Sequence, residues 1–600
     1  MSETEKKVED SQPKGAVDVK QKLNEYLEDF NGAFDYVKNN HHQKWEQHLK
    51  AYKGIRTNIG YNGYSDAFVP ETHTIIESLQ ANIAGGTQKF EYYPEDEEQE
   101  QDTKILTHRA NYVMNCNKGK ILLQNVIKDV LRFGNGFIHG GWNAQKKIPK
   151  LEIIPIWNFF ADPTAVDLET ARFVGHRYLT YKEDMEKETV INVETGQLEP
   201  KYKNLDMIRP VSGQGEETDK EIREKIFFGS TLGVNEKQVE VIRIYYANGK
   251  MVEIANRAAV ILDIDTPLQL PERQVTQEIQ MGDGMGGVVP QQIQKTLPAI
   301  SPFLPYAQFR DYVEPSLFYG SGEIEIILPR QETLNDVENQ DLDNMSYVNN
   351  TMFTVDPQFA DMIPEIENQP GAIYALPKGA LSVIEKGQMS QDVDYKKREI
   401  KDEMRRATAA DEVIQGAQVE NGSATATEIT SVVSSANTRF SSKIATFEGE
   451  GFNQLATLIR KLDQVFLSAE TKVRVMEENT PTYKEYDPAQ FSGDYEPHVL
   501  LETSIQKLEM DKSNKTRALA ELLLGNPVVN QQEAVRLILK DQKMKPDEIE
   551  KLLTLAQPPM MPPGMPGMPP GMTPPPMGNG MPPQMANLPQ QALAGMGNAG

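Results

Sequence analysis

Cysteine is nearly absent from this sequence, since Cys116 is the only one in 600 residues. A single thiol excludes a disulfide within the chain, which is typical of proteins that assemble in a reducing cytoplasm. Long apolar runs are also missing, and a membrane-spanning helix needs about 18 or more apolar residues in succession. The first residues, Met1–Lys7, hold no apolar stretch of the kind that a signal peptide requires. We therefore expect a cytoplasmic protein without a membrane segment.

Basic residues are few relative to acidic ones, with 62 Lys and Arg against 87 Asp and Glu and a formal net charge of -25. A protein that binds DNA tightly is usually basic, because contacts to phosphate dominate its affinity. Two interpretations are possible. The chain is either an acidic protein with no link to nucleic acid, or a conduit whose negative lining repels phosphate and lets DNA slide past. The charge alone leaves both open.

Signatures of enzymatic sites are weak or missing. Gly282–Gly287 matches the glycine pattern of a dinucleotide-binding loop, but no buried strand precedes it, and Pro290 stands where a helix should continue. No phosphate-binding P-loop occurs, and the eight histidines show no zinc-binding spacing. His41 and His48, seven residues apart, are expected on a solvated helix face. The sequence predicts no enzyme, no cofactor and no metal, while a metal-dependent hydrolase built from carboxylates stays an alternative.

The first half of the chain combines helices with strands, which predicts an α+β class with an antiparallel sheet. Asn248-Gly249 indicates a hairpin turn, whereas residues 269–298, rich in Gln, Gly and Pro, are expected to form a surface loop. Apolar residues at helical spacing predict helices over 17–49, after Pro70, after the acidic segment 95–102, and over 121–133. Short segments rich in β-branched and aromatic residues predict strands over Phe137–Trp142, Leu151–Trp157, Arg172–Thr180, Val239–Tyr246, Met251–Ile254 and Val260–Ile264.

The central stretch alternates helices with polar insertions. A strand-like run, Ile324–Leu328, precedes Pro329, which suits the first turn of a helix that continues to about Asn350. Its apolar stripe is interrupted by acidic residues. The segments expected next are a proline-containing, non-helical piece over 351–390, a second helix over 391–414 and a polar loop over 415–423.

A long amphipathic helix is expected after this loop. Thr425 and Glu428 fit a capping box at its start. Gly449 and Gly451 predict a kink, because each glycine costs a helix interior roughly 1 kcal/mol relative to alanine. The remaining predictions are strands at 472–476 and 499–503, short helices over 510–556, and disorder in the charged segment 1–16 and the Pro, Met and Gly-rich tail 557–600.

Three segments and the order of these elements carry a family resemblance. The segments are Tyr319–Glu323 before the first central helix, Pro370–Ile373 within the insertion, and Ala424–Ile429 before the long helix. Over roughly residues 60–510, the chain resembles the portal proteins of tailed bacteriophages, the head-to-tail connector family. The resemblance implies a portal-like subunit with a disordered N-terminus (1–16), an α+β wing (17–325), a first stem helix (326–350), a small β-containing clip (351–390), a second stem helix (391–414), a tunnel loop (415–423), a long kinked helix that returns to the wing (424–509), a helical crown (510–556) and a disordered C-terminal tail (557–600).

The resemblance also implies a function. Such subunits form a ring, commonly a dodecamer, at one vertex of the capsid in the virion, after assembly in the host cytoplasm. The ring is the conduit for genome packaging and ejection, and terminase and tail or neck proteins attach to it. The implied partners are other copies of the chain, the large terminase, head-completion or tail adaptor proteins, a major capsid or scaffold protein, and double-stranded DNA bound without sequence readout; no membrane is implied. Another phage structural protein, such as a head–tail adaptor or scaffold, is the alternative.

Three sets of residues are candidates for the functional surfaces of such a subunit. The DNA-facing tunnel loop would comprise Gln415, Gly416, Gln418, Glu420, Asn421, Gly422 and Ser423. The channel side of the stem would comprise Asp336, Asp341 and Asp343, for which a solvated outer face is the alternative. The partner surface of the clip would comprise Val355, Asp356, Pro357, Pro364, Ile373 and Tyr374.

Overall fold

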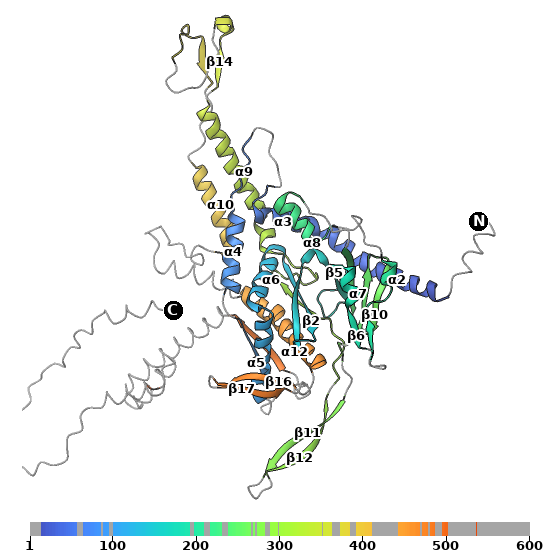
Figure 1. Ribbon diagram of the computed structural model, residues 1–600. Coiled ribbons are helices and arrows are strands. Elements are labelled where there is room, and N and C mark those ends of the chain that lie inside the picture. The colour runs from blue at the N-terminus through green and yellow to red at the C-terminus, as the bar shows by residue number, and fades with distance from the viewer. Residues whose placement is uncertain are drawn as a thin grey trace, which may run out of the picture. The chain divides into compact units, whose positions relative to one another are not determined.

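Helices and antiparallel sheets are combined in the computed structural model of the chain (Figure 1), which confirms the α+β class. The chain divides into two units, Met1–Glu509 and Met510–Gly600, and Arg536 is the one described residue of the second. The structure describes residues 14–56, 64–85, 88–94, 100–191, 197–208, 217–230, 238–265, 268–269, 273–282, 288–297, 299–350, 352–362, 373–384, 392–410, 442–467, 471–477, 480–486, 495–501 and 536.

The N-terminal helices follow the predicted apolar spacing closely. The first helical stretch begins at Lys14 and therefore reaches into the segment that was predicted to be disordered up to residue 16. It contains one π-helical turn, where both flanking residues keep α-helical backbone angles. Gly134, with a φ of 84°, ends α6 in the left-handed region that glycine adopts without strain. The helices are α2 (Lys14–Val37), the π-helical turn η1 (Lys38–His42), α3 (Gln43–Lys53), α4 (Glu71–Ala84), α5 (Glu100–Cys116) and α6 (Gly119–Phe133).

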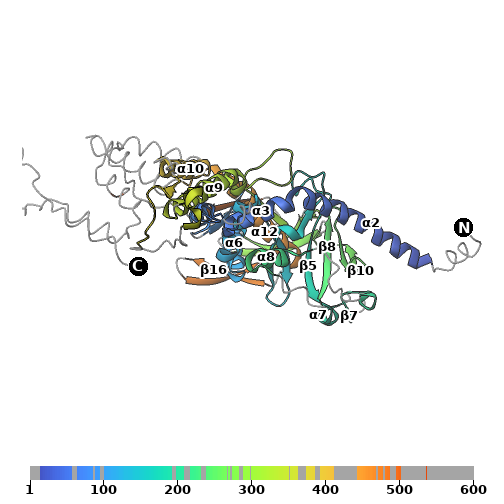
Figure 2. The ribbon, with the colours of Figure 1, turned by 90° about the horizontal axis from the view of Figure 1, so that it is seen from above.

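Two antiparallel sheets form the centre of the first unit (Figure 2). All six predicted strands are found, but the one predicted over Leu151–Trp157 ends at Ile154, because Pro155 and a 3-10 turn follow. The predicted hairpin turn at Asn248-Gly249 joins β8 to β9, with Gly249 at a φ of 88°. The five-stranded sheet has the order β10 (Ala259–Asp265), β9 (Lys250–Ala255), β8 (Gln238–Tyr246), β5 (Phe173–Tyr181), β4 (Phe159–Ala161). The three-stranded sheet has the order β13 (Tyr306–Arg310), β2 (Asn135–Asn143), β3 (Ile148–Ile154).

A large core lies where these sheets meet the helices. Its fully buried aromatic side chains include Trp157, Phe133 and Phe137, and the rings of Phe133 and Trp157 meet edge to face at 5.0 Å. A second cluster packs α2 on the five-stranded sheet through Phe30, Phe34 and Phe160. Short elements connect the sheets, namely η3 (Ile156–Asn158), α7 (Lys182–Lys187), β6 (Thr189–Ile191) paired with β7 (Leu198–Pro200), η4 (Leu205–Met207) and α8 (Asp219–Phe228).

The prediction of a surface loop over residues 269–298 is wrong. β11 (Arg273–Gly282) and β12 (Val288–Leu297) pair as an antiparallel ribbon over their whole length. The prediction weighed the Gln, Gly and Pro content of this segment. It overlooked the β-branched residues Val275, Thr276 and Ile279, which favour an extended backbone despite the glutamines around them.

Segments from both ends of the first unit build one body. β1 (Gln88–Pro94), which the sequence did not predict, pairs with β18 (Tyr495–Leu501) over seven residues. The strand predicted at 499–503 therefore exists and begins earlier, and the one at 472–476 is β16 (Thr471–Glu477), paired with β17 (Thr480–Tyr486). The predicted helices over 510–556 and the tail 557–600 lie outside the described residues, apart from helical Arg536.

The strand-like run before Pro329 is helical, which corrects the prediction. α9 (Glu323–Asn349) begins ahead of the run, and Pro329 lies inside the helix instead of in its first turn. Ile324, Ile327 and Leu334 are fully buried, whereas Ile326 is exposed. Burial thus recurs every three or four residues, which is the period of a helix and not of a strand.

The long helix predicted from residue 424 is described only from residue 442. Residues 442–447 are α-helical, η6 (Glu448–Phe452) is π-helical, and α12 (Asn453–Phe466) continues the helix. The change of helical period falls on Gly449 and Gly451, where the sequence predicted a kink. A π-helical turn is one of the local features that bend helices.

Candidate functional site

The two central helices pack against each other in antiparallel fashion (Figures 1 and 2). α10 (Val393–Ala407) presents the buried side chains of Ile400 and Met404, and ion pairs flank this apolar contact. They join Arg330 to Glu403 at 3.0 Å, Lys397 to Glu338 at 2.8 Å and Lys397 to Asp341 at 2.6 Å. The second helix was predicted to extend to residue 414, but it ends at Ala407, because Ala409 adopts a left-handed φ of 56°.

A row of polar side chains on α9 binds the backbone of Ser65–Thr72, which comprises the non-helical segment before α4 and the first two residues of α4. The Oδ1 of Asn339 accepts a hydrogen bond from the backbone N–H of Ala67 at 2.6 Å, and its Nδ2 donates to the Ala67 carbonyl at 2.9 Å. Asn335 accepts from the N–H of Val69 at 2.9 Å. The other members are Gln331, which accepts from Thr72 and donates to the Val69 carbonyl, and Asp343, which accepts from the N–H of Ser65 at 2.7 Å.

This amide ladder, Gln331, Asn335, Asn339 and Asp343, exists because two periods match. Four residues of α-helix advance about 6 Å, and two residues of extended chain advance about 6.6 Å. Asn335, Asn339 and Asp343 therefore meet every second residue of the non-helical segment. Gln331 departs from this register, because it accepts from the N–H of Thr72 in the first turn of α4. Sequence reasoning missed the ladder, although its signal, polar residues at a constant spacing of four, is present in the chain.

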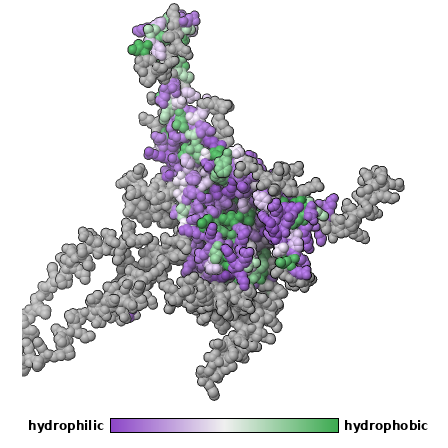
Figure 3. Space-filling model, in the orientation of Figure 1, coloured by the Kyte–Doolittle hydropathy of each residue, from purple (hydrophilic) through white to green (hydrophobic). Residues whose placement is uncertain are grey.

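The three aspartates predicted for the channel side all bind other parts of the same chain. Asp336 pairs with Arg56 at 2.8 Å, and its side chain is 59% exposed. Asp341 pairs with Lys397, and Asp343 is the last member of the amide ladder. Their charges are thus used within the subunit, and the channel-facing role stays a prediction. Figure 3 shows that the face of the α9–α10 pair in view carries hydrophilic residues along its length with smaller hydrophobic areas.

Beyond the ends of these helices lies a small two-stranded hairpin (Figure 1). β14 (Phe353–Val355) pairs with β15 (Leu381–Val383), and the 3-10 helix η5 (Pro357–Met362) follows β14. The segment 351–390 was predicted to be non-helical and to contain β structure. The β structure is confirmed, whereas η5 is a short helix, and Ile373, the end of the segment Pro370–Ile373, is irregular. The two strands of the hairpin contain the β-branched residues Val355 and Val383, which favour an extended backbone.

The predicted partner residues of this hairpin are mostly exposed. Val355 in β14 is 40% exposed, and Ile373 and Tyr374 are 96% and 36% exposed. Asp356 accepts a hydrogen bond from the N–H of Gln358, and Pro357 begins η5. Pro364 lies outside the described residues, as do all residues of the predicted tunnel loop, Gln415, Gly416, Gln418, Glu420, Asn421, Gly422 and Ser423.

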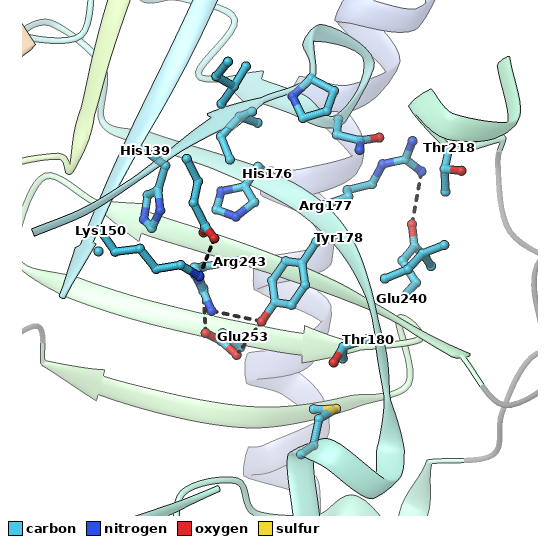
Figure 4. Close-up of a pocket in the computed structure, with 18 of the residues that line it drawn as sticks. His139, Lys150, His176, Arg177, Tyr178, Thr180, Thr218, Glu240, Arg243 and Glu253 are labelled. Atoms are coloured by element: carbon cyan, nitrogen blue, oxygen red, sulfur yellow. Dashed lines mark hydrogen bonds and ion pairs between the residues drawn. The ribbon is translucent and has the colours of Figure 1, made fainter. Parts of the chain in front are cut away.

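A separate cavity of about 1300 Å³ is lined by β2, β3, β5, β8 and β9 (Figure 4). On its wall Arg243 binds Glu253 at 2.6 Å and the hydroxyl of Tyr178 at 2.9 Å, and Arg177 binds Glu240 at 3.0 Å. The fifth charged side chain labelled in the figure, Lys150, pairs with Glu152. The cavity therefore presents paired charges and hydrogen-bonding groups without a concentrated charge of one sign.

Histidines contribute neutral groups to this cavity and to the core. Burial lowers the pKa of His139 to about 3, and its Nε2 lies 3.2 Å from the hydroxyl of Tyr245. The solvated helix face predicted for His41 and His48 is wrong, because the ring of His41 stacks on Trp45 at 5.3 Å and His48 is buried. Burial lowers the pKa of both to about 4. All three imidazoles are therefore uncharged at neutral pH.

Neither a metal centre nor a membrane helix is found in the described part of the chain. No three or more His, Cys, Asp or Glu side chains are grouped there so that they could hold a metal ion. The helices described include none with the length and apolar character needed to cross a membrane. The single cysteine, Cys116, is exposed.

The sequence was also compared with known proteins. No protein-family model matches the chain, and no curated protein matches it.

Proposed function

We propose that this chain is the subunit of a viral portal ring, the conduit for packaging and ejection of genome DNA. One observation carries the proposal. The chain leaves an α+β body at Glu323 in α9, turns back through the β14–β15 hairpin and α10, and re-enters the body by residue 442. An antiparallel helix pair with a hairpin at its far end is the arrangement expected of a stem and clip inserted into a wing.

The pairing of β1 with β18 supports the same interpretation. It joins segments before and after the insertion, so the body is a single unit through which the chain passes twice. In the proposal this body is the wing, α9 and α10 are the stem, and residues 352–384 are within the clip. Residues 415–423, which lie outside the described part of the chain, would be the tunnel loop. The crown and tail would follow β18.

The exposed apolar residues of the hairpin favour assembly. Phe353 and Val355 are 45% and 40% exposed on β14, and Val383 on β15 is 54% exposed. A hairpin with three residues in each strand is not stable by itself in water. A neighbouring subunit that pairs with a strand edge or covers these side chains would stabilise the hairpin, and repetition of that contact around an axis closes a ring.

The charge of the chain fits a conduit. A net charge of -25 in each subunit, multiplied around a ring, gives a strongly negative assembly that repels phosphate. DNA would pass without sequence readout. In this proposal the ring sits at a capsid vertex of the virion after assembly in the host cytoplasm, and it binds large terminase, then head-completion or tail adaptor proteins, and a capsid or scaffold protein.

Negative-stain electron microscopy of the purified full-length protein, with native mass spectrometry, tests the proposal. The expected result is a ring with a central channel and a mass that is a multiple of 67.5 kDa. A monomer or dimer at every concentration, with and without a scaffold protein, would refute it.

A matched pair of variants connects the ring to the hairpin. Phe353→Asp places a charge on the exposed apolar face of β14, and it should reduce the fraction of protein in rings. Thr354→Asp changes the neighbouring residue, which points to the opposite face of the strand, and serves as the control. Equal loss of rings in both variants would count against the proposed contact.

A further inference from the structure

A buried group of charges joins the start of α9 to the helix that contains Lys443. The ammonium of Lys443 binds Oδ1 of Asp311, which follows β13, and Oε1 of Glu323, the first residue of α9. Tyr312 donates from its hydroxyl to Oε2 of Glu323 at 3.3 Å, and Lys443 lies over the Tyr312 ring at 4.2 Å from its centre. The end of β13 and the start of α9 thus meet the helix at 442–447, which lies more than a hundred residues later in the chain.

The charges of this group do not balance. Two carboxylates share one ammonium, and the side chains of Asp311 and Glu323 are fully inaccessible to water. The Oδ2 atom of Asp311 is buried without a hydrogen-bond partner. An excess negative charge in a closed site is costly, because neither water nor a second cation is there to stabilise it. Binding of one proton by the carboxylates removes the excess.

The surrounding groups indicate which carboxylate takes the proton. Burial, followed by the charge of Asp311, raises the pKa of Glu323 to about 8. Burial also raises the pKa of Asp311, against the effect of Lys443, and the two carboxylates hold the pKa of Lys443 above its ordinary value. Burial raises the pKa of Tyr312 to about 12, so it stays neutral.

Nearby charges outside the group are occupied elsewhere. Arg310, next to Asp311, binds Glu450 at 3.1 Å, and Glu325, two residues after Glu323, binds Lys44 at 3.4 Å. The loop after α6 approaches Asp311 with the carbonyl of Gly134, which accepts from the Asp311 N–H at 3.2 Å. These contacts supply no second cation to the group.

We propose that Asp311, Glu323 and Lys443 form a proton-dependent latch, which holds the helix at 442–447 against the base of α9 while Glu323 is protonated and loosens when Glu323 ionises. The latch itself follows from the geometry. Its consequence rests on the proposed function, because in a portal subunit residues 442–447 lead back from the tunnel loop and α9 is a stem helix. The latch would then connect the tunnel loop to the stem.

The sign of the pH effect follows from the proton balance. Glu323 binds its proton more tightly when the latch is closed than when its side chain reaches water. Raising the pH from about 4.5 to about 8 therefore favours opening, and the closed state is fully favoured only below that interval. Because one proton is released on opening, the opening constant rises by up to about tenfold for each pH unit within this interval.

Hydrogen exchange of the full-length protein, followed by mass spectrometry at pH 6 to 9, measures this opening. Exchange in peptides covering 323–327 and 442–447, corrected for the intrinsic pH dependence of exchange, should rise by one to two powers of ten, whereas Glu323→Gln should remove that rise. The control Glu332→Gln changes an exposed glutamate on the same helix and should leave the rise unchanged. Equal pH dependence in the wild type and Glu323→Gln would overturn the latch.

A second variant keeps the test decisive if Glu323→Gln does not fold. Asp311→Asn removes a neighbouring charge that raises the pKa of Glu323 in the closed state, so the rise in exchange should level off at a lower pH and be smaller than in the wild type. A rise of the same size that levels off at the same pH as in the wild type would also overturn the proposal. Both measurements are made whether or not rings form, so a failure of the latch is distinguishable from a failure of the proposed function.

Discussion

Gly449 and Gly451 lie two residues apart in the π-helical turn η6, yet alanine should have opposite effects at the two positions. Gly449 is exposed, and a Cβ added there would meet nothing within 4 Å. A Cβ added at Gly451 would lie 2.1 Å from Cδ1 of Phe309 and 2.5 Å from two further atoms of that ring. Phe309 cannot move aside, because it is fully buried and its ring meets Phe452 edge to face at 5.2 Å.

The size of each effect follows from these surroundings. Alanine in place of an exposed helical glycine stabilises a protein by about 0.5 to 1 kcal/mol. Overpacking of a rigid core costs about 1 to 3 kcal/mol. We therefore expect the free energy of unfolding to be slightly higher in Gly449→Ala than in the wild type, and lower by about 1 to 3 kcal/mol in Gly451→Ala.

Urea unfolding monitored by circular dichroism, with both variants beside the wild type, checks the prediction. The midpoint should rise or stay level for Gly449→Ala and fall for Gly451→Ala. Hydrogen exchange of peptides covering β13 and α12 locates the damage, and it should increase only in Gly451→Ala. If the two variants shift the midpoint equally, the close contact between Gly451 and Phe309 is not what requires glycine there.

Three further predictions concern the ladder, the loop and the tail. Asn339→Leu leaves the N–H and carbonyl of Ala67 without their partners and should lower the free energy of unfolding by about 2 kcal/mol, measured in urea, while the exposed control Asn349→Leu should change it by less than about 0.5 kcal/mol. Deletion of 418–423 should spare ring assembly and impair packaging or retention of DNA; full packaging yield would contradict the tunnel-loop assignment. Removal of 558–600 should leave a folded ring, and failure to assemble would show that the tail is structural.

The local sequence pattern was sufficient to predict the helices and strands whose apolar residues are buried in a continuous core. The helix over 121–133 was predicted from apolar spacing and appears as α6, with Leu123, Val126, Ile127 and Val130 fully buried. Strands β5, β8, β9 and β10 of the five-stranded sheet were predicted from their β-branched and aromatic residues, whereas β4 was not predicted. Val241, Ile242 and Ile244 are buried in β8, which packs on both of its faces. In these elements the residues that set the local period also form the core.

Local sequence patterns gave wrong predictions where a segment distant in the sequence determines which residues are buried. Ile324–Leu328 has the composition of a strand, and only the burial of Ile324 and Ile327 against the body selects the helix. His48 was placed on a solvated face, because nothing local shows that the aromatic core closes over it. β1 was missed because its partner, β18, lies some four hundred residues later in the chain.

The acidic residues of α9 show that a charge pattern in the sequence does not by itself identify a channel surface. Asp341 and Asp343 interrupt the apolar stripe, and the sequence alone offers a channel or bulk solvent as the reason. In the structure Asp341 neutralises Lys397, and Asp343 accepts from the backbone of Ser65. Their presence therefore has a sufficient explanation within one subunit. Asp336 differs, since more than half of its side chain is exposed although it pairs with Arg56.

The exposed positions of α9 further distinguish Asp336 from the other two predicted channel residues, Asp341 and Asp343. Among the exposed residues of α9, Ile326, Pro329, Thr333, Asp336 and Gln340 recur every three or four positions and form a stripe, because residues at this spacing lie on one side of a helix. Other exposed residues of α9 are Arg330, Glu332 and residues 345–349. In the proposed ring, one side of α9 would face a neighbouring subunit or the channel, and this stripe is a side of α9 that the described part of the chain leaves exposed. Asp336 is the one predicted channel residue that belongs to it, so the channel assignment is best tested at Asp336.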